Sequence, residues 1–276
     1  MSSLPKPPVW LITGCSSGFG LNLALLALRN GHKVIASSRN ISKTPKEVSQ
    51  IEKLGGAWIE LDVCSPNATT ILDKATAIHG RIDILVNNAA YALLGAFETF
   101  SDAECRAEME TNFFAPLNLC RHVIPRMRTR RSGLIINMSS TAGIEAKPSR
   151  TMYSASKFAL EAFSEALYHE MKPFGVRVLL VEPGAFRSSF AENMTVGAVH
   201  QLRSGSSPGD LEKGCQAIFD VALKTGQAEG MEEFLRLPLG KDGSERWKVK
   251  LKDLRKTLDA TEFIWSKTDH DDIAGQ

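Results

Sequence analysis

The sequence predicts an α/β fold, a doubly wound parallel sheet covered by helices on both faces. Two observations support this fold class. Short, almost wholly apolar runs alternate with stretches of helical periodicity, and the first apolar run leads through a glycine-rich turn directly into a helix. Apolar strands of this kind are typical of parallel sheets that are buried on both sides. With 276 residues, of which 43% are hydrophobic, the chain can fill one such core.

The elements follow one another in a β-α-β order. Strands are predicted at 9–14, 33–38, 57–63, 82–89, 133–140 and 176–184. Helices are predicted at 19–31, 45–56, 66–79, 102–130 and 151–173. The segment 185–210 is long and rich in small polar residues, which is typical of a functional lid or of disorder. Helical periodicity returns at 211–225, and 233–240 is predicted to be a last strand and turn.

This pattern indicates a single domain with a C-terminal extension. No linker rich in Pro, Gly and Ser interrupts the first 185 residues. We therefore assign 1–240 to one domain, which includes the long segment 185–210. We expect 241–276 to form a charged, helical extension, with the helix centred on 244–259.

Composition excludes several classes of protein. The 33 Lys and Arg residues nearly balance 31 Asp and Glu residues, so a net charge of +2 gives no general attraction to nucleic acid or membranes. The basic run 126–133 is interpreted as a solvated helix end, since no aromatic residues flank it as they would in a nucleic-acid patch. The apolar runs are far shorter than the roughly 20 residues of a membrane-spanning helix. We expect a cytoplasmic protein with no membrane span.

The cysteines indicate neither a metal site nor a disulfide framework. The five residues Cys15, Cys64, Cys105, Cys120 and Cys215 are widely scattered, and no pair has C-x-x-C spacing. Buried, reduced thiols are the better interpretation, and they fit a reducing compartment.

The first predicted strand runs into TGCSSGFG, residues 13–20, and a helix follows at once. Gly14 permits the sharp turn, Gly18 lets the backbone approach a phosphate, and Gly20 lets the helix pack close to the strand. The N-terminus of that helix offers free N–H groups and a partial positive charge to a pyrophosphate. The arrangement predicts dinucleotide binding by a Rossmann-type sheet.

The end of the second predicted strand distinguishes between two cofactors. An acidic residue there would bind the ribose 2′-hydroxyl of NAD, whereas an arginine suits the 2′-phosphate of NADP. The chain has ASSRN at 36–40, with Arg39 and no carboxylate. A guanidinium can hold a phosphate through two hydrogen bonds, although an arginine after a strand can also be simply solvated. We predict that the cofactor is NADP(H).

Further motifs, in the expected order and spacing over 9–190, resemble those of the short-chain dehydrogenase/reductase family. The glycine loop matches T-G-x-x-x-G-x-G, Asp62-Val63 matches the adenine pocket, NNAA at 87–90 matches N-N-A-G, and Pro183-Gly184 matches P-G. Tyr153 and Lys157 match Y-x-x-x-K, Ser140 lies 13 residues before the tyrosine, and Asn112 lies in ETNFF. In its general sequence character, the chain also resembles fungal NADP-dependent oxidoreductases of this family.

The resemblance implies a catalytic domain over 1–240 with a substrate loop at 185–210. It implies a cofactor site made of Gly14, Ser16, Ser17, Gly18, Phe19, Gly20, Ser38, Arg39, Asp62, Val63, Asn88, Ala89, Tyr153, Lys157, Pro183, Gly184, Phe186 and Ser188. It also implies a homodimer or homotetramer formed by helix 151–173 and the long helix before it. Small residues are expected at exposed positions of that helix: Ala155, Ala159, Ala162, Ser164 and Ala166.

The implied catalytic residues are Asn112, Ser140, Tyr153 and Lys157. Tyr153 and Lys157 are four residues apart and therefore share one helix face. An ammonium and the cationic nicotinamide ring both favour the phenolate, so we expect the Tyr153 pKa to fall below its reference value of about 10.

These residues are given the following roles. Tyr153 is predicted to be the general acid in reduction and the base in oxidation. Lys157 would lower the pKa of the tyrosine and bind the nicotinamide ribose. Ser140 would hold the substrate oxygen, with Ser139 as the alternative, and Asn112 would position a water in a proton relay.

Two positions depart from the family pattern. Ala90 replaces the last glycine of N-N-A-G and adds one methyl group near the cofactor, where we expect a small adjustment. Ser188 replaces the usual threonine, and its hydroxyl can still reach the nicotinamide carboxamide.

The substrate pocket implied by the resemblance is mainly apolar. Its lining would be Tyr91, Leu93, Leu94, Thr141, Ala142, Ile144, Phe186, Phe190 and Met194, although these side chains suit core or lid packing equally well. The lining predicts a medium-sized hydrophobic ketone, aldehyde or alcohol as the substrate. The alternative function is a non-catalytic NADP-sensing or scaffold protein on the same fold, against which the intact tyrosine and lysine argue.

Overall fold

A seven-stranded parallel sheet forms the centre of the molecule. The computed structural model describes residues 7–188, 195–196 and 207–268. The strands lie in the order β3-β2-β1-β4-β6-β7-β9, and every neighbouring pair is parallel. Their bounds are β1 Val9–Ile12, β2 Lys33–Ser38, β3 Ala57–Glu60, β4 Ile84–Asn87, β6 Gly133–Met138, β7 Val176–Pro183 and β9 Arg236–Leu239. The predicted doubly wound parallel sheet in one domain is confirmed.

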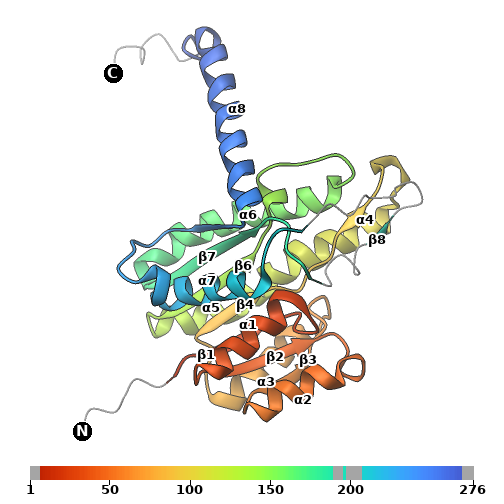
Figure 1. Cartoon of the computed structure of the whole chain (residues 1–276), viewed down its shortest axis with the longest axis vertical. Helices are drawn as coiled ribbons and strands as arrows, with labels where there is room; N and C mark the ends of the chain where they lie inside the picture. Colours follow the sequence, from red (N-terminus) through yellow and green to blue (C-terminus); the bar gives the residue numbers. More distant parts are fainter. Residues whose placement is uncertain (1–6, 189–194, 197–206, 269–276) are drawn as a thin grey trace.

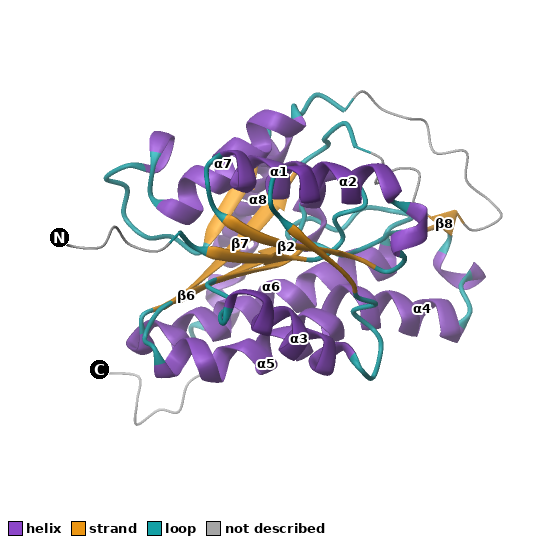
Figure 2. Ribbon diagram, turned by 90° about the horizontal axis from the view of Figure 1, so that it is seen from below, coloured by secondary structure: helices purple, strands orange, loops and turns teal. Residues whose placement is uncertain are grey.

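Helices cover both faces of this sheet, as Figure 2 shows. One face carries α1 (Gly18–Arg29), α2 (Pro45–Lys53) and α7 (Leu211–Leu223). The other face carries α3 (Ala68–His79), α5 (Ala115–Thr129) and α6 (Thr151–Met171). Helix α4 (Asp102–Met109) precedes α5, and α8 (Lys241–Trp265) extends away from the body of the molecule (Figure 1).

The first strand shows how the apolar runs fill two separate cores. Trp10 and Ile12 lie in the core beneath α1 and α7, whereas Val9 and Leu11 lie in the core above α3 and α5. Successive side chains of a strand point to opposite faces, so a strand that is covered on both sides must be apolar throughout. This requirement explains why the strand runs lack the polar alternation of a half-exposed sheet.

The chain order reverses at β1, which lies between β2 and β4 in the sheet. In sheets of this type, ligands bind outside the carboxyl ends of the strands at such a switch point. The carboxyl ends of β1, β4, β6 and β7 lead directly to the glycine loop, Asn88, Ser140 and Gly184. The topology therefore collects the predicted motifs at one edge of the sheet.

The structure differs from the prediction in three places. The stretch 102–130 is not one regular helix, because a π-helical segment, Glu110–Phe114, joins α4 to α5. Such segments are rare and occur frequently at functional sites, and this one contains Asn112. A small second sheet pairs β5 (Leu93–Leu94) with β8 (Thr195–Val196). The C-terminal helix is longer than 244–259 and includes all of Lys241–Trp265.

The basic run at the end of α5 makes local contacts. Arg126 forms an ion pair of 2.9 Å with Asp73, and the Arg128 guanidinium lies 5.4 Å from the ring centre of Phe174. All five cysteines are free thiols. Within the described residues, no helix is long and apolar enough to cross a membrane.

Candidate active site

The glycine loop joins β1 to α1 in a conformation that requires its glycines. Gly14 has a φ of +68°, and a Cβ there would lie 2.8 Å from the Cα of Ala89. A Cβ on Gly20 would lie 2.5 Å from both the Asn88 amide nitrogen and the Gly14 carbonyl oxygen. Side chains at these positions would push the loop away from the segment that follows β4, so the loop can adopt this close packing only with glycine.

The N-terminus of α1 is open to a ligand. Gly18 has a φ of +60°, and among the described residues a Cβ there would meet only the Ser188 side chain, at 3.6 Å. Within the described part of the chain, the Ser17 side chain accepts none of the first-turn N–H groups, and the first turn holds no carboxylate. The free N–H groups and the helix dipole at this end suit a phosphate. The loop therefore fits the pyrophosphate of a dinucleotide.

Asn88 and Ala89 support this loop from below. The Asn88 side-chain amide donates to the carbonyl oxygens of Thr13 at 2.8 Å and Gly14 at 3.1 Å. The Thr13 hydroxyl accepts the N–H groups of Asn88 at 2.9 Å and Ala89 at 3.0 Å. These contacts fix the end of β4 to the end of β1, so Asn88 acts on the glycine loop itself.

The loop after β7 returns to the same place. The rings of Phe19 and Phe186 pack edge to face with their centres 5.1 Å apart. The Gly184 N–H donates to the Leu239 carbonyl oxygen at 2.9 Å, which continues the pairing of β7 with β9. The predicted cofactor residues at 14–20 and 183–188 are thus adjacent in space, although about 165 residues separate them in the sequence.

The end of β2 presents a free positive charge. Arg39 is exposed, and no carboxylate among the described residues forms an ion pair with it. Ser38, in contrast, is buried, and its hydroxyl accepts the Trp58 indole N–H at 3.2 Å. The geometry leaves Arg39 available to a 2′-phosphate and gives Ser38 a structural contact.

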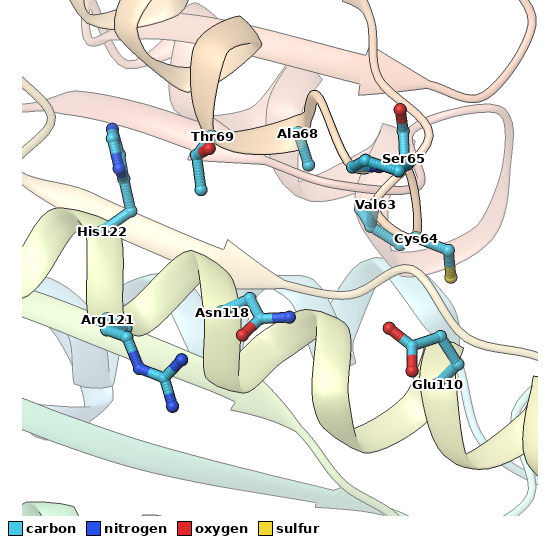
Figure 3. A pocket seen from close by; sticks show the side chains of 10 residues that line it. Val63, Cys64, Ser65, Ala68, Thr69, Glu110, Asn118, Arg121 and His122 are labelled. Atoms are coloured by element: carbon cyan, nitrogen blue, oxygen red, sulfur yellow. The ribbon is translucent and has the colours of Figure 1, made fainter.

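Asp62 and Val63 follow β3, and Val63 borders a surface cavity of about 450 Å³ (Figure 3). Asp62 accepts the Cys64 N–H at 3.0 Å, which shapes the turn. The cavity lies between this turn, the start of α3 and helix α5. Its lining consists of Val63, Cys64, Ser65, Pro66, Ala68, Thr69, Glu110, Asn118, Arg121 and His122. None of the predicted catalytic residues lines this cavity.

Tyr153 and Ser140 are neighbours at the carboxyl end of β6. Tyr153 is 8% exposed, and the Ser140 hydroxyl lies close enough to act on its pKa. Burial raises the pKa of Tyr153 to about 12, against the lowering effects of Ser140 and of the Arg150 charge. The expected lowering of this pKa by Lys157 is therefore wrong for the chain on its own, in which burial has the larger effect.

Lys157 lies in the same turn of α6 and is also buried. Its ammonium donates to the Met138 carbonyl oxygen at 2.8 Å and lies 5.8 Å from the centre of the Tyr153 ring. Burial lowers the pKa of Lys157 to about 8, while the Glu108 and Glu161 carboxylates act in the opposite direction. A lysine with this pKa can gain and lose a proton close to neutral pH.

The two neighbouring serines have different surroundings. The Ser140 hydroxyl accepts the Ala142 N–H at 3.1 Å and contacts Tyr153. The Ser139 hydroxyl is buried and lies near Gly143 and Glu161. The geometry therefore distinguishes Ser140 from its neighbour as the serine that faces the tyrosine.

Asn112 connects three segments at the back of the site. Its side-chain nitrogen donates to the Tyr91 carbonyl oxygen at 2.9 Å and to the Ser156 hydroxyl at 3.0 Å. Its side-chain oxygen accepts the Tyr91 N–H at 3.2 Å. Asn112 thus holds the loop after β4 against α6, beside Lys157.

Part of the predicted pocket lining contacts Tyr153 directly. Ala92, Leu94 and Ala142 form a small buried apolar cluster with the tyrosine. Leu93, Thr141 and Ile144 are also buried, whereas Phe190 and Met194 lie outside the described residues. The side of the site that faces the phenol is therefore apolar.

Glu108 is a further buried polar residue whose charge acts on Lys157, and the sequence motifs did not identify it. Its side chain is completely buried, and Oε1 accepts the Leu93 N–H at 2.9 Å. Oε2 has no hydrogen-bond partner among the described residues. Burial raises the pKa of Glu108 to about 7, and the Leu93 N–H and the Lys157 charge oppose this. Its position four residues before Asn112 was the one sequence signal available.

The first turns of α8 also reach the site, which no sequence motif indicated. Asp242 accepts the Ala185 N–H at 2.9 Å. The Arg246 guanidinium donates to the Thr141 hydroxyl at 3.0 Å, one residue from Ser140. The start of α8 therefore braces both the loop after β6 and the loop after β7.

A buried carboxyl pair connects α8 with α6. Glu182 is completely buried, accepts the Trp247 indole N–H at 2.5 Å and lies near the Glu161 carboxylate, which acts on its pKa. Burial and the Glu161 charge raise the pKa of Glu182 to about 8, so Glu182 holds a proton at neutral pH, and burial also raises the pKa of Glu161. The Arg236 Nε lies 3.3 Å from Glu161 and 3.5 Å from Glu182 and balances the remaining charge.

The comparison with known families agrees with this geometry. The sequence profile described as short chain dehydrogenase matches residues 8–197, from the first strand to the end of β8. The chain belongs to the short-chain dehydrogenase family. It is therefore an oxidoreductase, and the family uses a nicotinamide cofactor.

Two curated relatives resemble this dehydrogenase. Oxidoreductase claN of Passalora fulva is 46% identical over 182 residues, which cover 66% of the chain and 83% of the relative. A 3-ketodihydrosphingosine reductase of Bacteroides thetaiotaomicron is 39% identical over 192 residues, which cover 69% of the chain and 68% of the relative.

Solved structures extend the similarity to almost the whole dehydrogenase. A short-chain dehydrogenase from Streptomyces avermitilis has a TM-score of 0.87 and 33% identity and covers 97% of this chain and 100% of its own. A metagenomic short-chain oxidoreductase in complex with NADP has a TM-score of 0.68, 26% identity and coverages of 85% and 99%. An NAD+-bound xylitol dehydrogenase has a TM-score of 0.62, 25% identity and coverages of 66% and 71%. Structural neighbours thus include complexes with both cofactors.

Proposed function

We propose that this dehydrogenase uses NADP(H) to interconvert a medium-sized hydrophobic ketone or aldehyde with its alcohol, with Tyr153 as the general acid and base. The observation that carries the proposal is the position of Tyr153, which lies beside Ser140, 5.8 Å from the buried Lys157 ammonium and against an apolar wall. A phenol in this position can deliver a proton to a carbonyl oxygen that Ser140 also contacts.

The proton chemistry follows from the charges of these residues. In reduction, the protonated phenol of Tyr153 donates to the carbonyl oxygen, while the Ser140 hydroxyl stabilises the charge that develops on it. The bound cofactor supplies or accepts the hydride. Lys157 holds the nicotinamide ribose, and its ammonium favours the phenolate that remains. Asn112 positions a water that returns the proton from solvent.

Arg39 supports the choice of NADP. It is exposed at the end of β2 and lacks an acidic partner in the described residues, so a 2′-phosphate is the group it is free to bind. A carboxylate at the same end of the strand would repel that phosphate, and the sequence has none at 36–40.

The apolar cluster around Tyr153 supports the substrate class. Leu94 and Ala142 contact the phenol side of the site, where a polar substrate would find few hydrogen-bond partners. The relative named as a 3-ketodihydrosphingosine reductase is consistent with a ketone substrate. Cytoplasmic location is supported by the five free thiols.

A homodimer or homotetramer built on α5 and α6 is part of the proposal. Ala155, Ala162 and Ala166 are exposed on α6, and Ala159 is half-buried. Ser164 does not belong to this face, because it is buried and accepts the Asn137 amide at 2.8 Å.

A substrate panel tests the proposed activity. Purified protein with NADPH is offered hydrophobic ketones and aldehydes of increasing length, and cofactor oxidation is followed by absorbance. We expect turnover for apolar carbonyls and little for sugar phosphates. Tight NADPH binding with no turnover anywhere in a broad apolar panel would favour the non-catalytic sensor instead.

A further inference from the structure

Helix α8 carries an unpaired apolar seam. After its first turns, which contact the body, the helix projects away from the rest of the molecule (Figure 1). Every side chain from Leu251 to Ala260 is exposed. Three leucines in or next to this free part, Leu251, Leu254 and Leu258, are 51–55% exposed. Exposed leucines in such a series are unusual on a soluble surface and indicate a contact.

The spacing of the seam indicates another helix as its partner. Leu251, Leu254, Leu258, Thr261 and Trp265 follow one another at intervals of 3, 4, 3 and 4 residues. This is the a/d pattern of a coiled coil, a stripe narrower than that of a helix lying on a sheet or membrane. Val249 and Phe263 lie on the opposite side of the helix, outside the seam. The free part, from Lys250 to Trp265, is about 24 Å long at 1.5 Å per residue.

The charges indicate that the partner is a second copy in antiparallel orientation. Among the described residues, 241–256 contain seven Lys and Arg against three Asp and Glu, whereas 257–268 contain Asp259 and Glu262 against Lys267. Antiparallel pairing places the basic half of each helix beside the end of the other helix that carries this small negative charge. A parallel pair would place like halves together and would set Lys250 near the second copy's Arg255.

The residues that flank the leucine seam also favour antiparallel pairing. When Leu254 packs against the second copy's Leu258, Lys248 lies opposite the second copy's Glu262, and the contact occurs twice by symmetry. Arg255 meets its own symmetry mate at the centre, but it is already paired with Asp259 at 2.8 Å within the helix.

We propose that two copies of the protein associate through α8 as an antiparallel helix pair along the seam Leu251–Leu254–Leu258–Trp265. This interface is separate from the α5 and α6 faces and does not depend on the proposed reaction. Because the first turns of α8 also hold Thr141 and Ala185 at the active site, the pairing would connect the two sites through rigid helices.

The first test is the mass of the full-length protein by sedimentation equilibrium over a range of concentrations. In the double variant Leu254→Asp with Leu258→Asp, we expect the assembly mass to halve. Val249→Asp is the matched control, because Val249 is 52% exposed on the same helix but lies off the seam, and its mass should equal that of the wild type. Both should bind NADPH normally, which shows that they fold. A wild-type mass for the seam variant, or a monomeric wild type, overturns the proposal.

A second test distinguishes antiparallel from parallel pairing, and helix pairing from binding to a lipid surface. Lys248→Glu and Glu262→Lys should each weaken the assembly, and the two together should restore it. Failure of the double variant to restore it would exclude the antiparallel pair. Co-sedimentation with phosphatidylcholine vesicles containing phosphatidylserine should show no binding. Vesicle binding that the seam variant loses, without any change in mass, would assign α8 to a membrane surface.

Discussion

The ammonium of Lys157 lies 5.8 Å from the centre of the Tyr153 ring and donates to the Met138 carbonyl oxygen at 2.8 Å. Both side chains are buried, and burial moves both pKa values towards the neutral forms, to about 12 for Tyr153 and about 8 for Lys157. A charged group that binds in the site stabilises the ionised form of the residue with the opposite charge, and so shifts the pKa of that residue. The two residues are therefore poised to respond to the charge of what binds between the glycine loop and the apolar wall.

Lys157→Met should remove this response. We expect NADPH to bind more weakly, because the ribose contact is lost, and kcat to fall by about 10²- to 10³-fold, as for loss of a group that assists proton transfer. Lys147→Met, which removes an exposed ammonium of the loop before α6, is the control and should change neither value. Fluorescence titration and steady-state kinetics measure the two effects. An unchanged kcat in Lys157→Met would contradict the role given to the lysine.

Ser140→Ala and Ser139→Ala form a matched pair of adjacent substitutions. Ser140 contacts Tyr153, so its loss should reduce kcat/KM by about 10²-fold or more, on the scale of losing one oxyanion donor. Ser139 faces Glu161, so its loss should change kcat/KM only a few-fold. Equal effects in the two variants would show that the hydroxyl facing the tyrosine has no special part in the reaction.

Arg39→Asp should exchange the cofactor preference. The substitution removes the exposed guanidinium and introduces a carboxylate that repels a 2′-phosphate and can accept from a 2′-hydroxyl. We expect the Kd for NADPH to rise at least tenfold and that for NADH to fall. Arg29→Asp changes the net charge equally at the far end of α1 and serves as the control. A preference that stays the same in Arg39→Asp would rule out Arg39 as the selecting residue.

The raised pKa of Glu182 predicts how the free energy of unfolding depends on pH. Its pKa is raised from 4.5 to about 8 in the folded protein, so the folded state holds a proton that the unfolded state has lost. The stabilising contribution is complete below about pH 4.5 and is lost as the pH rises through about 8, with a slope on the order of 1 kcal/mol per pH unit at its steepest.

Glu182→Gln should flatten this dependence in urea unfolding measured between pH 5 and pH 9, because glutamine cannot lose the proton. Glu165→Gln is the control, since Glu165 is exposed and Arg236 lowers its pKa. A wild-type slope in Glu182→Gln would mean that the proton resides elsewhere in the cluster.

The sequence was sufficient for the parts of the molecule that local patterns determine. The apolar strands, the glycine loop and the order of the motifs predicted the sheet and the edge where Ser140, Tyr153 and Lys157 meet. Burial by distant segments was not accessible in this way. Glu108 on α4, Glu182 on β7 and Arg246 on α8 reach their partners only through packing between elements that are far apart in the chain. The same packing reverses the expected direction of the Tyr153 pKa, because the number of atoms that surround a phenol cannot be read from its neighbours in sequence.

The central claim is that the Tyr153 hydroxyl donates and accepts the proton of the reaction. Tyr153→Phe keeps the ring that packs against Leu94 and Ala142 and removes only the hydroxyl. NADPH binding by fluorescence titration and single-turnover reduction of an accepted carbonyl should be measured on the same preparation. We predict a Kd for NADPH within a few-fold of the wild type and a reduction rate lower by about 10²- to 10⁴-fold. Normal cofactor binding together with a reduction rate close to that of the wild type would contradict the claim.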